Sequence, residues 1–305
     1  MTGKIGRRST AEQVTEGLDL SGKTAVVTGV NSGLGQETMR VLALRGAHVV
    51  GAARSISKAR AACDTVEGST TPVACELSDM KSVAACAADI REMGRPVDIL
   101  VCNAGIMALP ELKVKKGLEL QFLTNHMGHF LLTWLLQEPL KQAPAARIVM
   151  LSSLAHKHTV RGGIDFDNLD GARGYRAWAF YGQSKLANLL TARAFNDHLA
   201  GTGVSANAVH PGVINTGLSR NLTGLSGWLQ NSRVSKAITN RLISKTIPQG
   251  ASTQCYVATH PDLEGIGGCY FADNHRARPS RHALDDGLKQ RLWDYSLEYL
   301  ADWVR

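Results

Sequence analysis

Apolar residues along this chain gather in short β-branched runs that are separated by segments of helical length. The runs lie between residues 24 and 212 and read TAVVTG, AHVVGAA, TPVACEL, VDILVCNAG, ARIVMLSS and GVSANAVHPG. Continuous apolar strands that alternate with helices are typical of a parallel sheet with helices on both faces. We therefore predict a single α/β domain built on a doubly wound parallel sheet.

The two ends and one internal segment depart from this alternation. Residues 1–20 are polar and predict an N-terminal arm, ahead of a main domain over 21–275. Inside that domain we expect long loops or helical excursions over 154–180 and 214–247, then a helix at PQGASTQCYVATH and a last strand at GCYFAD. Apolar residues recur at helical spacing in 276–305, so this C-terminal extension should pack against the domain.

Composition excludes several classes of protein. With 305 residues, 44% of them hydrophobic, the chain can bury a substantial core. Its formal charge is +8, but no run of five or more basic residues occurs, so a nucleic-acid surface is not predicted. Six cysteines without a Cys-x-x-Cys pair or a secretory leader favour reduced thiols in a cytoplasmic protein over disulfides or a metal site. The apolar stretches are also shorter than the roughly 18 to 20 residues of a membrane span.

The first predicted strand runs through a glycine-rich turn into a helix, TAVVTGVNSGLGQETMRVLALRG. Glycines in such a turn let the backbone bend tightly, approach a pyrophosphate and pack the helix on the strand, while the helix N-terminus offers unpaired N–H groups. An ordinary strand-to-helix turn is the alternative, but the place at the first βα turn favours a Rossmann-like dinucleotide site. Its predicted contacts are Gly29, Asn31, Ser32, Gly33, Leu34 and Gly35.

The end of the second predicted strand bears on which dinucleotide is bound. About 20 residues past the turn, a carboxylate is expected if the ribose 2′-hydroxyl is held. This chain has Ala53 followed by Arg54, which removes repulsion toward a 2′-phosphate and offers guanidinium N–H groups to it. We therefore expect a preference for NADP(H), with NAD(H) as the alternative cofactor and a solvated surface arginine as the structural alternative.

A tyrosine and a lysine in YGQSK stand four residues apart in a helical pattern. Residues i and i+4 share a helix face, so Lys185 can approach the ligand that Tyr181 touches. At about 4 Å and an effective dielectric near 20, a phenolate and an ammonium attract by roughly 4 kcal/mol, or about three pKa units, before desolvation is counted. This predicts a lowered pKa for Tyr181 and a role in acid/base catalysis on an alcohol or carbonyl. The spacing alone is common, so a surface pair is the alternative.

Further motifs around this pair give the chain a family resemblance. In order they are TGVNSGLG, CNAG at 102–105, LTNHMGHF at 123–130, SSLAH at 152–156, YGQSK at 181–185 and HPGVINT at 210–216. With them the chain resembles the short-chain dehydrogenase/reductase superfamily over about residues 18 to 275, and within it the retinol-dehydrogenase-like and WW-domain-oxidoreductase-like branch. The resemblance implies an oxidoreductase that transfers a hydride. Vertebrate retinol dehydrogenases usually carry an N-terminal membrane anchor and this chain shows none, which implies a soluble, bacterial relative.

The resemblance also assigns roles to residues. By it, Tyr181 is the catalytic acid/base, and Lys185 lowers the pKa of Tyr181 and holds the nicotinamide ribose. Ser153, with Ser152 as its competitor, would hydrogen-bond the reacting oxygen, and Asn125 would keep a water near Lys185 in a proton relay. Further cofactor contacts are implied at Glu76 and Leu77 near the adenine, at Asn103, Ala104 and Gly105 on the adenosine side, and at Pro211, Gly212, Val213 and Thr216 by the nicotinamide carboxamide. Glu76 stands where the family often has an aspartate, which puts its contact with the adenine in question.

The substrate is expected at the carboxyl ends of the strands, where ligands bind in open parallel sheets and where 154–180 and 214–247 emerge. The apolar residues of these segments either line a pocket for a bulky apolar ketone, aldehyde or secondary alcohol, or form a small core of their own. They are Leu154, Trp178, Leu218, Leu222, Leu225 and Trp228. Four histidines suggest a metal site, but no carboxylate or thiolate motif joins them, so satisfied or solvent-facing side chains and no metal are predicted. These are His126, His129, His156 and His158.

Three other functions stay open beside an NADP(H)-preferring dehydrogenase. They are an NAD(H)-preferring dehydrogenase of the same fold, a non-catalytic nucleotide-sensing module, and an epimerase or dehydratase that uses tightly held NAD. The last class usually has a larger C-terminal domain than this chain leaves room for. By analogy we expect a homodimer or homotetramer, unless the C-terminal helix covers the pairing surface and keeps the chain monomeric.

Overall fold

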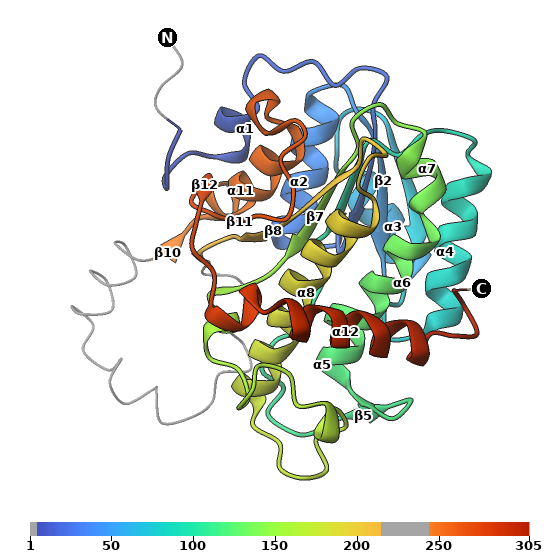
Figure 1. Cartoon of the computed structure of the whole chain (residues 1–305). Coiled ribbons are helices and arrows are strands. Elements are labelled where there is room, and N and C mark those ends of the chain that lie inside the picture. The colour runs from blue at the N-terminus through green and yellow to red at the C-terminus, as the bar shows by residue number, and fades with distance from the viewer. Residues whose placement is uncertain (1–4, 215–243, 305) are drawn as a thin grey trace.

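One twisted sheet lies at the centre of the computed structural model, which describes residues 5–214 and 244–304 (Figure 1). Among these residues the strand order is β12-β11-β8-β7-β4-β1-β2-β3, and neighbouring strands are parallel except for the β11–β12 pair. The strands are β1 (Thr24–Thr28), β2 (His48–Ala53), β3 (Thr70–Ala74), β4 (Ile99–Cys102), β7 (Arg147–Leu151), β8 (Ser205–His210), β11 (Tyr270–Ala272) and β12 (His275–Arg276). The pattern of apolar runs predicts all of these strands but β12, which is too short to show a period.

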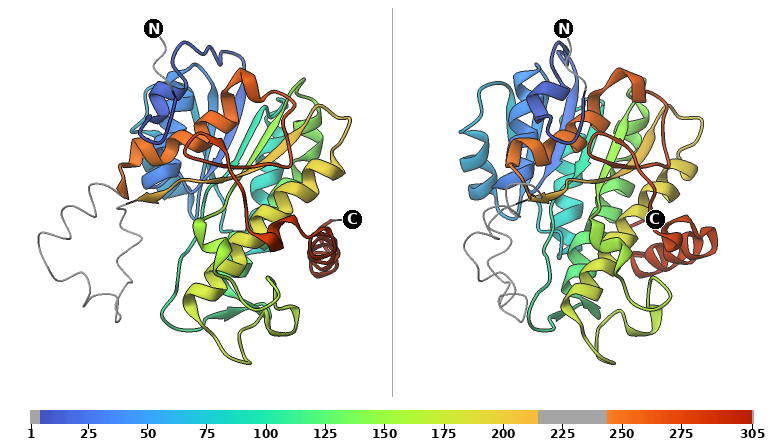
Figure 2. Two further views of the ribbon diagram at one scale, coloured as in Figure 1. Left: turned by 60° about the vertical axis from the view of Figure 1, so that its left-hand side comes forward. Right: turned by 90° about the vertical axis from the view of Figure 1, so that its left-hand side faces the viewer.

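Helices cover both faces of this sheet, as Figures 1 and 2 show. One face carries α2 (Gly33–Leu44), α3 (Ile56–Cys63) and α11 (Ile247–Thr259), and the other carries α4 (Met80–Glu92), α6 (Gly128–Leu135), α7 (Gln137–Lys141) and α8 (Ala177–His198). The shorter elements are α1 (Ala11–Val14), α5 (Leu120–Phe122), the π-helical turn η1 (Leu123–Met127), the 3-10 turns η2 (Leu154–Lys157), η3 (Phe166–Asn168), η5 (Pro261–Leu263) and η6 (Arg281–Leu284), and the two-residue strands β5 (Val114–Lys115), β6 (Leu118–Glu119), β9 (Val213–Ile214) and β10 (Ser244–Lys245). No helix among the described residues combines the length and the apolar character needed to cross a membrane.

The central strands are apolar on both sides because each side packs under helices. In β1, Val26 belongs to the core beneath α4, α6 and α8, whereas its neighbours Ala25 and Val27 belong to the core beneath α2, α3 and α11. Val26 pairs in register with Val50 of β2 and with Leu100 of β4, so each core runs on from strand to strand. Because these strands are parallel, the carboxyl ends of β1, β4, β7 and β8 meet at one edge of the sheet.

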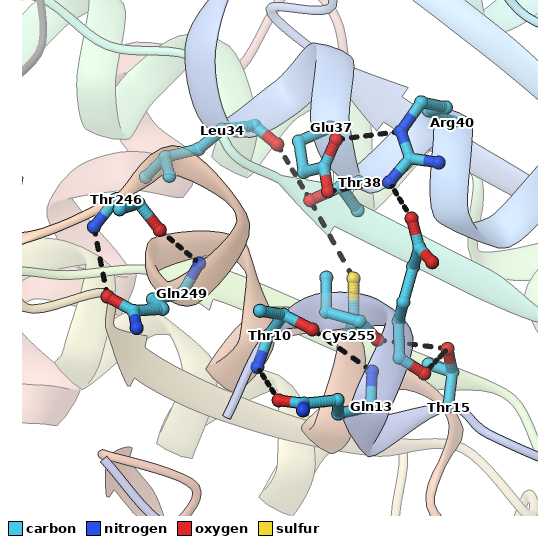
Figure 3. Close-up of polar contacts among 12 residues, drawn as sticks. Thr10, Gln13, Thr15, Leu34, Glu37, Thr38, Arg40, Thr246, Gln249 and Cys255 are labelled. Atoms are coloured by element: carbon cyan, nitrogen blue, oxygen red, sulfur yellow. Dashed lines mark hydrogen bonds and ion pairs between the residues drawn. The ribbon is translucent and has the colours of Figure 1, made fainter. Parts of the chain in front are cut away.

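The N-terminal residues are packed onto the helical layer that holds α2 and α11. Thr10 caps α1 in a capping box with Gln13, and the buried Ala11 and Val14 join a small cluster with residues of α2 and α11. The guanidinium of Arg40 bonds to both Glu37 and Glu12, which ties α1 to α2 (Figure 3). The expected arm is therefore a docked segment.

The C-terminal residues form α12 (Asp286–Tyr299), which lies across α8 (Figures 1 and 2). Trp293 of α12 stands in an aromatic cluster with Phe130, Trp134, Phe195 and His198 of α6 and α8, at centroid separations of 5.0 to 5.9 Å. Such aromatic burial contributes several kcal/mol to packing, so α12 is part of the folded domain.

Candidate active site

The glycine turn lies at the carboxyl end of β1, where three chain segments converge. Gly29 has a φ of +75°, and a Cβ built on it would stand 2.9 Å from the Cα of Ala104. A Cβ on Gly35, at the start of α2, would collide with the carbonyl of Gly29 and the amide of Asn103. Only glycine permits this approach of α2 to the turn and of the turn to the loop after β4. Gly33 has a φ of +63° and needs glycine for that backbone conformation.

The N-terminus of α2 opens at this turn. Ser32 is the N-cap residue in extended conformation, but its side chain makes no capping hydrogen bond. Asn31 and Ser32 are exposed and Leu34 is half-buried. The first N–H groups of a twelve-residue helix are thus left without a side-chain cap and beside a glycine cradle, which suits a pyrophosphate.

The ends of β2 and β3 flank the turn on one side. Arg54 directly follows β2, is exposed, and has no hydrogen-bond or ion-pair partner among the described residues. After β3, Oε1 of Glu76 accepts from the backbone N–H and the hydroxyl of Ser78, both at 3.0 Å. Leu77 points into the core, and its backbone packs against Gly128 so closely that a Cβ there would overlap it. Leu77 can therefore offer only backbone atoms to a ligand.

The loop after β4 is joined to the catalytic side by a buried chain of hydrogen bonds. The hydroxyl oxygen of Thr28 accepts from the backbone N–H groups of Asn103 (2.9 Å) and Ala104 (3.0 Å) and lies 2.9 Å from Nε2 of His129. Nδ1 of His129 lies 2.9 Å from the backbone oxygen of Asn125. Since a carbonyl only accepts, Nδ1 carries the proton, and Nε2 accepts from the hydroxyl of Thr28. Gly105 follows in this loop and is exposed. Sequence reasoning assigned no role to Thr28 or His129.

Asn125 lies in the π-helical turn η1, and its side chain is fully used. Its Oδ1 accepts from the N–H of Ile106 (2.8 Å), and its Nδ2 donates to the carbonyl of Ile106 and the hydroxyl of Ser184, both at 2.9 Å. A π-turn shifts the helical carbonyls out of their usual pairing and recurs at functional sites. Asn125 therefore joins the loop after β4 to α8, the helix that carries Tyr181 and Lys185.

Tyr181 and Ser153 are brought together by a glycine that sequence reasoning did not single out. A Cβ on Gly182 would stand 2.6 Å from the carbonyls of Ala155 and His158, so glycine lets α8 touch the backbone of η2. This brings the hydroxyl of Ser153 close enough to the Tyr181 phenol to favour its ionised form and so lower its pKa. Its neighbour Ser152 instead donates to the backbone oxygen of Lys185 at 2.8 Å.

The pKa of Tyr181 does not follow the expected electrostatics. Burial raises it to about 12, opposed by the hydrogen bond from Ser153. The side chain of Lys185 donates to the carbonyl of Leu151 at 3.0 Å and lies 5.8 Å from the centroid of the tyrosine ring. Burial also lowers the pKa of Lys185 to about 8. In the protein alone, burial therefore dominates the pKa of Tyr181, and Lys185 is not among the groups that shift it.

The loop after β8 and three apolar side chains border the cluster. Pro211 and Gly212 are half-buried, and Gly212 has a φ of +94° and packs on Lys245. Leu154, Trp178 and Val213 are 45%, 50% and 53% exposed, and the Trp178 ring stands edge-on to the Tyr181 ring at 6.0 Å. Thr216 and the expected pocket residues Leu218, Leu222, Leu225 and Trp228 lie outside the described residues.

Three of the four histidines are buried and hydrogen-bonded through both ring nitrogens. His126 meets the hydroxyls of Ser296 and Thr191, His129 joins Thr28 to Asn125, and His156 meets the backbone of Ser153 and Ser280. His158 is exposed. The interpretation as satisfied or solvent-facing side chains accounts for each of them.

Sequence relatives and solved structures both place this chain among the short-chain dehydrogenases. Residues 23–166 match the short chain dehydrogenase family. A short-chain dehydrogenase TIC 32 B, chloroplastic, of Brassica napus is 41% identical over 98% of this chain and 96% of its own length. Retinol dehydrogenase 12 of Mus musculus is 40% identical over 94% and 89%, and the human WW domain-containing oxidoreductase is 36% identical over 94% and 70%.

Solved structures agree with the sequence relatives. A crystal structure described as a putative uncharacterized protein from Mycobacterium Paratuberculosis has a TM-score of 0.75 and 32% identity, over 94% of this chain and 96% of that one. A putative NAD(P) dependent gluconate 5-dehydrogenase from Beutenbergia cavernae, with bound NADP, has a TM-score of 0.63 and 25% identity over 84% and 97%. With a Rossmann-like sheet, a glycine cradle at its edge and relatives along almost all of its length, the chain belongs to the short-chain dehydrogenases, NAD(P)-dependent oxidoreductases that act on CH–OH groups.

Proposed function

We propose that this protein is an NADP(H)-preferring dehydrogenase/reductase of apolar ketones, aldehydes or secondary alcohols, with Tyr181 as the acid/base. The observation that carries the proposal is the convergence of Tyr181, Ser153, Lys185 and Asn125 at the sheet edge that also holds the glycine turn. The alternative of a nucleotide-sensing module without chemistry does not account for this buried cluster.

In the reductive direction, the phenol of Tyr181 gives its proton to the substrate oxygen while Ser153 donates a hydrogen bond to that oxygen. The glycine cradle with the N-terminus of α2 would hold the pyrophosphate of a nicotinamide cofactor, which would supply the hydride when bound. Lys185, held by Leu151, faces Gly105 on the cofactor side. Asn125, whose side chain bonds to Ile106 and Ser184 and whose backbone oxygen bonds to His129, would hold a water near Lys185 for a proton relay. The raised pKa keeps Tyr181 protonated at neutral pH, as a general acid requires.

The first test is Tyr181→Phe, followed by NADPH absorbance against a panel of apolar ketones and aldehydes. We expect kcat to fall by about 100-fold or more, because the proton donor is lost. Tyr175→Phe is the control, since it likewise removes a phenol hydroxyl, one that donates to the backbone carbonyl of Leu109 and has no assigned part in the reaction. Undiminished turnover by Tyr181→Phe contradicts the proposed chemistry, and a wild type that turns over no member of the panel favours the sensing module.

The NADP(H) preference rests on Arg54, which is exposed beside the turn with no carboxylate at Ala53. The apolar substrate class rests on the exposed ring of Trp178, which stands beside Tyr181, and on the exposure of Leu154 and Val213 in the loops after β7 and β8; exposed apolar side chains there suit an apolar ligand better than an internal core of these loops. Retinol dehydrogenase 12 of Mus musculus, a relative named for its action on an apolar alcohol, supports the same substrate class.

We also propose a compartment and an oligomeric state for the enzyme. All six cysteines are free and buried, which suits a reducing compartment such as the cytoplasm. Because α12 already lies over α8, we favour a monomer over a homodimer or homotetramer that pairs through this helix. Size-exclusion chromatography with light scattering measures the oligomeric state.

A further inference from the structure

The backbone of Ser153 is held by a buried histidine that reaches a distant part of the chain. His156 is fully buried in η2, and its Nδ1 lies 2.6 Å from the carbonyl of Ser153. The carbonyl accepts, so Nδ1 carries the proton and Nε2 is left as an acceptor. The backbone N–H of Ser280 donates to that Nε2 at 3.0 Å. One imidazole thus links Ser153 to the C-terminal extension.

The extension itself is fixed to the helix that carries Tyr181. Shortly after Ser280, the guanidinium of Arg193 in α8 donates to the carbonyl of Ala283 at 2.8 Å and pairs with Asp286 at 2.7 Å. The ring of His156 also stands edge-on to Tyr270 of β11, at 5.0 Å. Ser280 is therefore presented to His156 by a segment anchored on both α8 and the sheet.

The same peptide is held from its other side. Nδ1 of His210, at the end of β8, accepts the N–H of Leu154 at 3.2 Å. The hydroxyl of Ser153 accepts the N–H of Ala155 at 3.2 Å, within the same turn. The peptide between Ser153 and Leu154 is thus clamped at its carbonyl by His156 and at its N–H by His210. Rotation of this peptide would turn the hydroxyl of Ser153 away from Tyr181.

We propose that the contact between Ser280 and His156 makes the C-terminal extension a positioning element for Ser153, so that segment 276–305 takes part in turnover as well as in folding. The inference rests on the proposed function, in which Ser153 bonds to the reacting oxygen. His156 is a positioning residue, because it acts through Ser153 and does not touch the substrate oxygen itself. Burial lowers the pKa of His156, which keeps its imidazole neutral and Nε2 available as an acceptor.

A matched pair of substitutions at Ser280 tests the contact. Ser280 has a φ of −68°, which lies in the range of proline, so Ser280→Pro removes the N–H donor at a backbone φ that proline adopts. The hydroxyl of Ser280 is buried and has no hydrogen-bond partner among residues 5–214 and 244–304, so Ser280→Ala removes no hydrogen bond within that part of the chain and leaves the N–H donor intact. We expect Ser280→Pro to lower kcat about tenfold against Ser280→Ala, with a larger primary deuterium isotope effect and an unchanged KM for NADPH. Equal kcat values for the two variants overturn the proposal.

A double-mutant cycle covers the case in which the proline disturbs folding. His156→Phe keeps a ring beside Tyr270 but loses both hydrogen bonds. If both substitutions act through the same contact, adding Ser280→Pro to His156→Phe lowers kcat no further. If the kcat of the double variant falls by the product of the two single losses, the two substitutions act independently and the proposal is overturned.

A readout without turnover separates this inference from the proposed function. In uniformly ¹⁵N-labelled protein, the Nε2 resonance of His156 should shift in Ser280→Pro and stay in place in Ser280→Ala, and the amide signal of Leu154 should shift with it. An inactive wild type with these shifts contradicts the proposed function and leaves the positioning contact established. Unchanged shifts overturn the contact whatever the activity.

Discussion

The glycine turn after β1 and the catalytic cluster between η2 and α8 lie at the same edge of the sheet, but different forces position them. At the turn, Gly29 and Gly35 leave room for the close approach of neighbouring backbone and of the side-chain amide of Asn103. In the cluster, buried side chains from five parts of the chain hold Ser153, Asn125 and Lys185 through directional hydrogen bonds. The comparison suggests that the cofactor side is sensitive to volume, whereas the catalytic side is sensitive to the loss of single hydrogen bonds.

The largest effect should come from adding volume to the turn. Gly35→Ala would place a methyl group against the carbonyl of Gly29, and backbone cannot move aside as a flexible side chain can. We expect a melting temperature lower by about 10 °C or more and loss of NADPH binding, measured by scanning fluorimetry and NADPH fluorescence. Gly33→Ala is the control, because a Cβ there meets no atom within 4 Å and only the positive φ opposes it, at a cost of about 1 to 2 kcal/mol. Equal losses would mean that strain, not volume, governs the turn.

Removing one imidazole from the catalytic side should act on kcat. His129→Leu deletes the bridge from Thr28 to Asn125, and we expect kcat to fall by about tenfold or more while KM for NADPH changes little. His126→Leu is the matched control, since His126 is equally buried and bonded at both nitrogens but reaches Ser296 and Thr191 instead. If both variants lose stability and kcat in proportion, His129 has only a structural role.

A charge reversal at the rim of the cofactor side should give a smaller, selective effect. Arg54→Asp replaces the exposed guanidinium by a carboxylate that repels a 2′-phosphate. We expect KM for NADPH to rise about tenfold, or 1.4 kcal/mol, with the KM for NADH unchanged or lower. Steady-state kinetics with both cofactors measures these KM values. Equal changes in KM for NADPH and NADH would show that Arg54 does not select between the two cofactors.

Mild acid should weaken the catalytic side gradually. Burial lowers the pKa of His126 to about 3 and of His129 to about 4 from the usual 6.5, so between pH 6.5 and 4 the unfolded chain binds protons that the folded protein does not. The stability from these groups is complete above pH 6.5 and is lost as pH falls, by about 1.4 kcal/mol per histidine per pH unit. Urea denaturation of wild type and His126→Leu at pH 7 and pH 5.5 should show the smaller loss in the variant, and identical losses would exclude His126 as a source.

Local patterns predict the cofactor side well, because its requirements lie within one short stretch. The period of the apolar runs indicates the parallel sheet, and three glycines between a strand and a helix indicate the turn, before any contact is known. The motif order likewise predicts that Tyr181, Ser153, Lys185 and Asn125 come together. The lowered pKa of Tyr181 is not borne out, since a helical spacing carries no information on how deeply the pair is buried.

The sequence by itself determined the fold class and the glycine turn, because each depends on the order and spacing of neighbouring residues, and its resemblance to short-chain dehydrogenases supplied the catalytic candidates. Only the tertiary structure decided how the catalytic side chains are held. Thr28 meets His129, Gly182 meets η2, and Ser280 meets His156 across 124 positions of the chain. Such contacts leave no periodic signal, because they arise when parallel strands and the C-terminal extension bring distant backbone groups within hydrogen-bond reach.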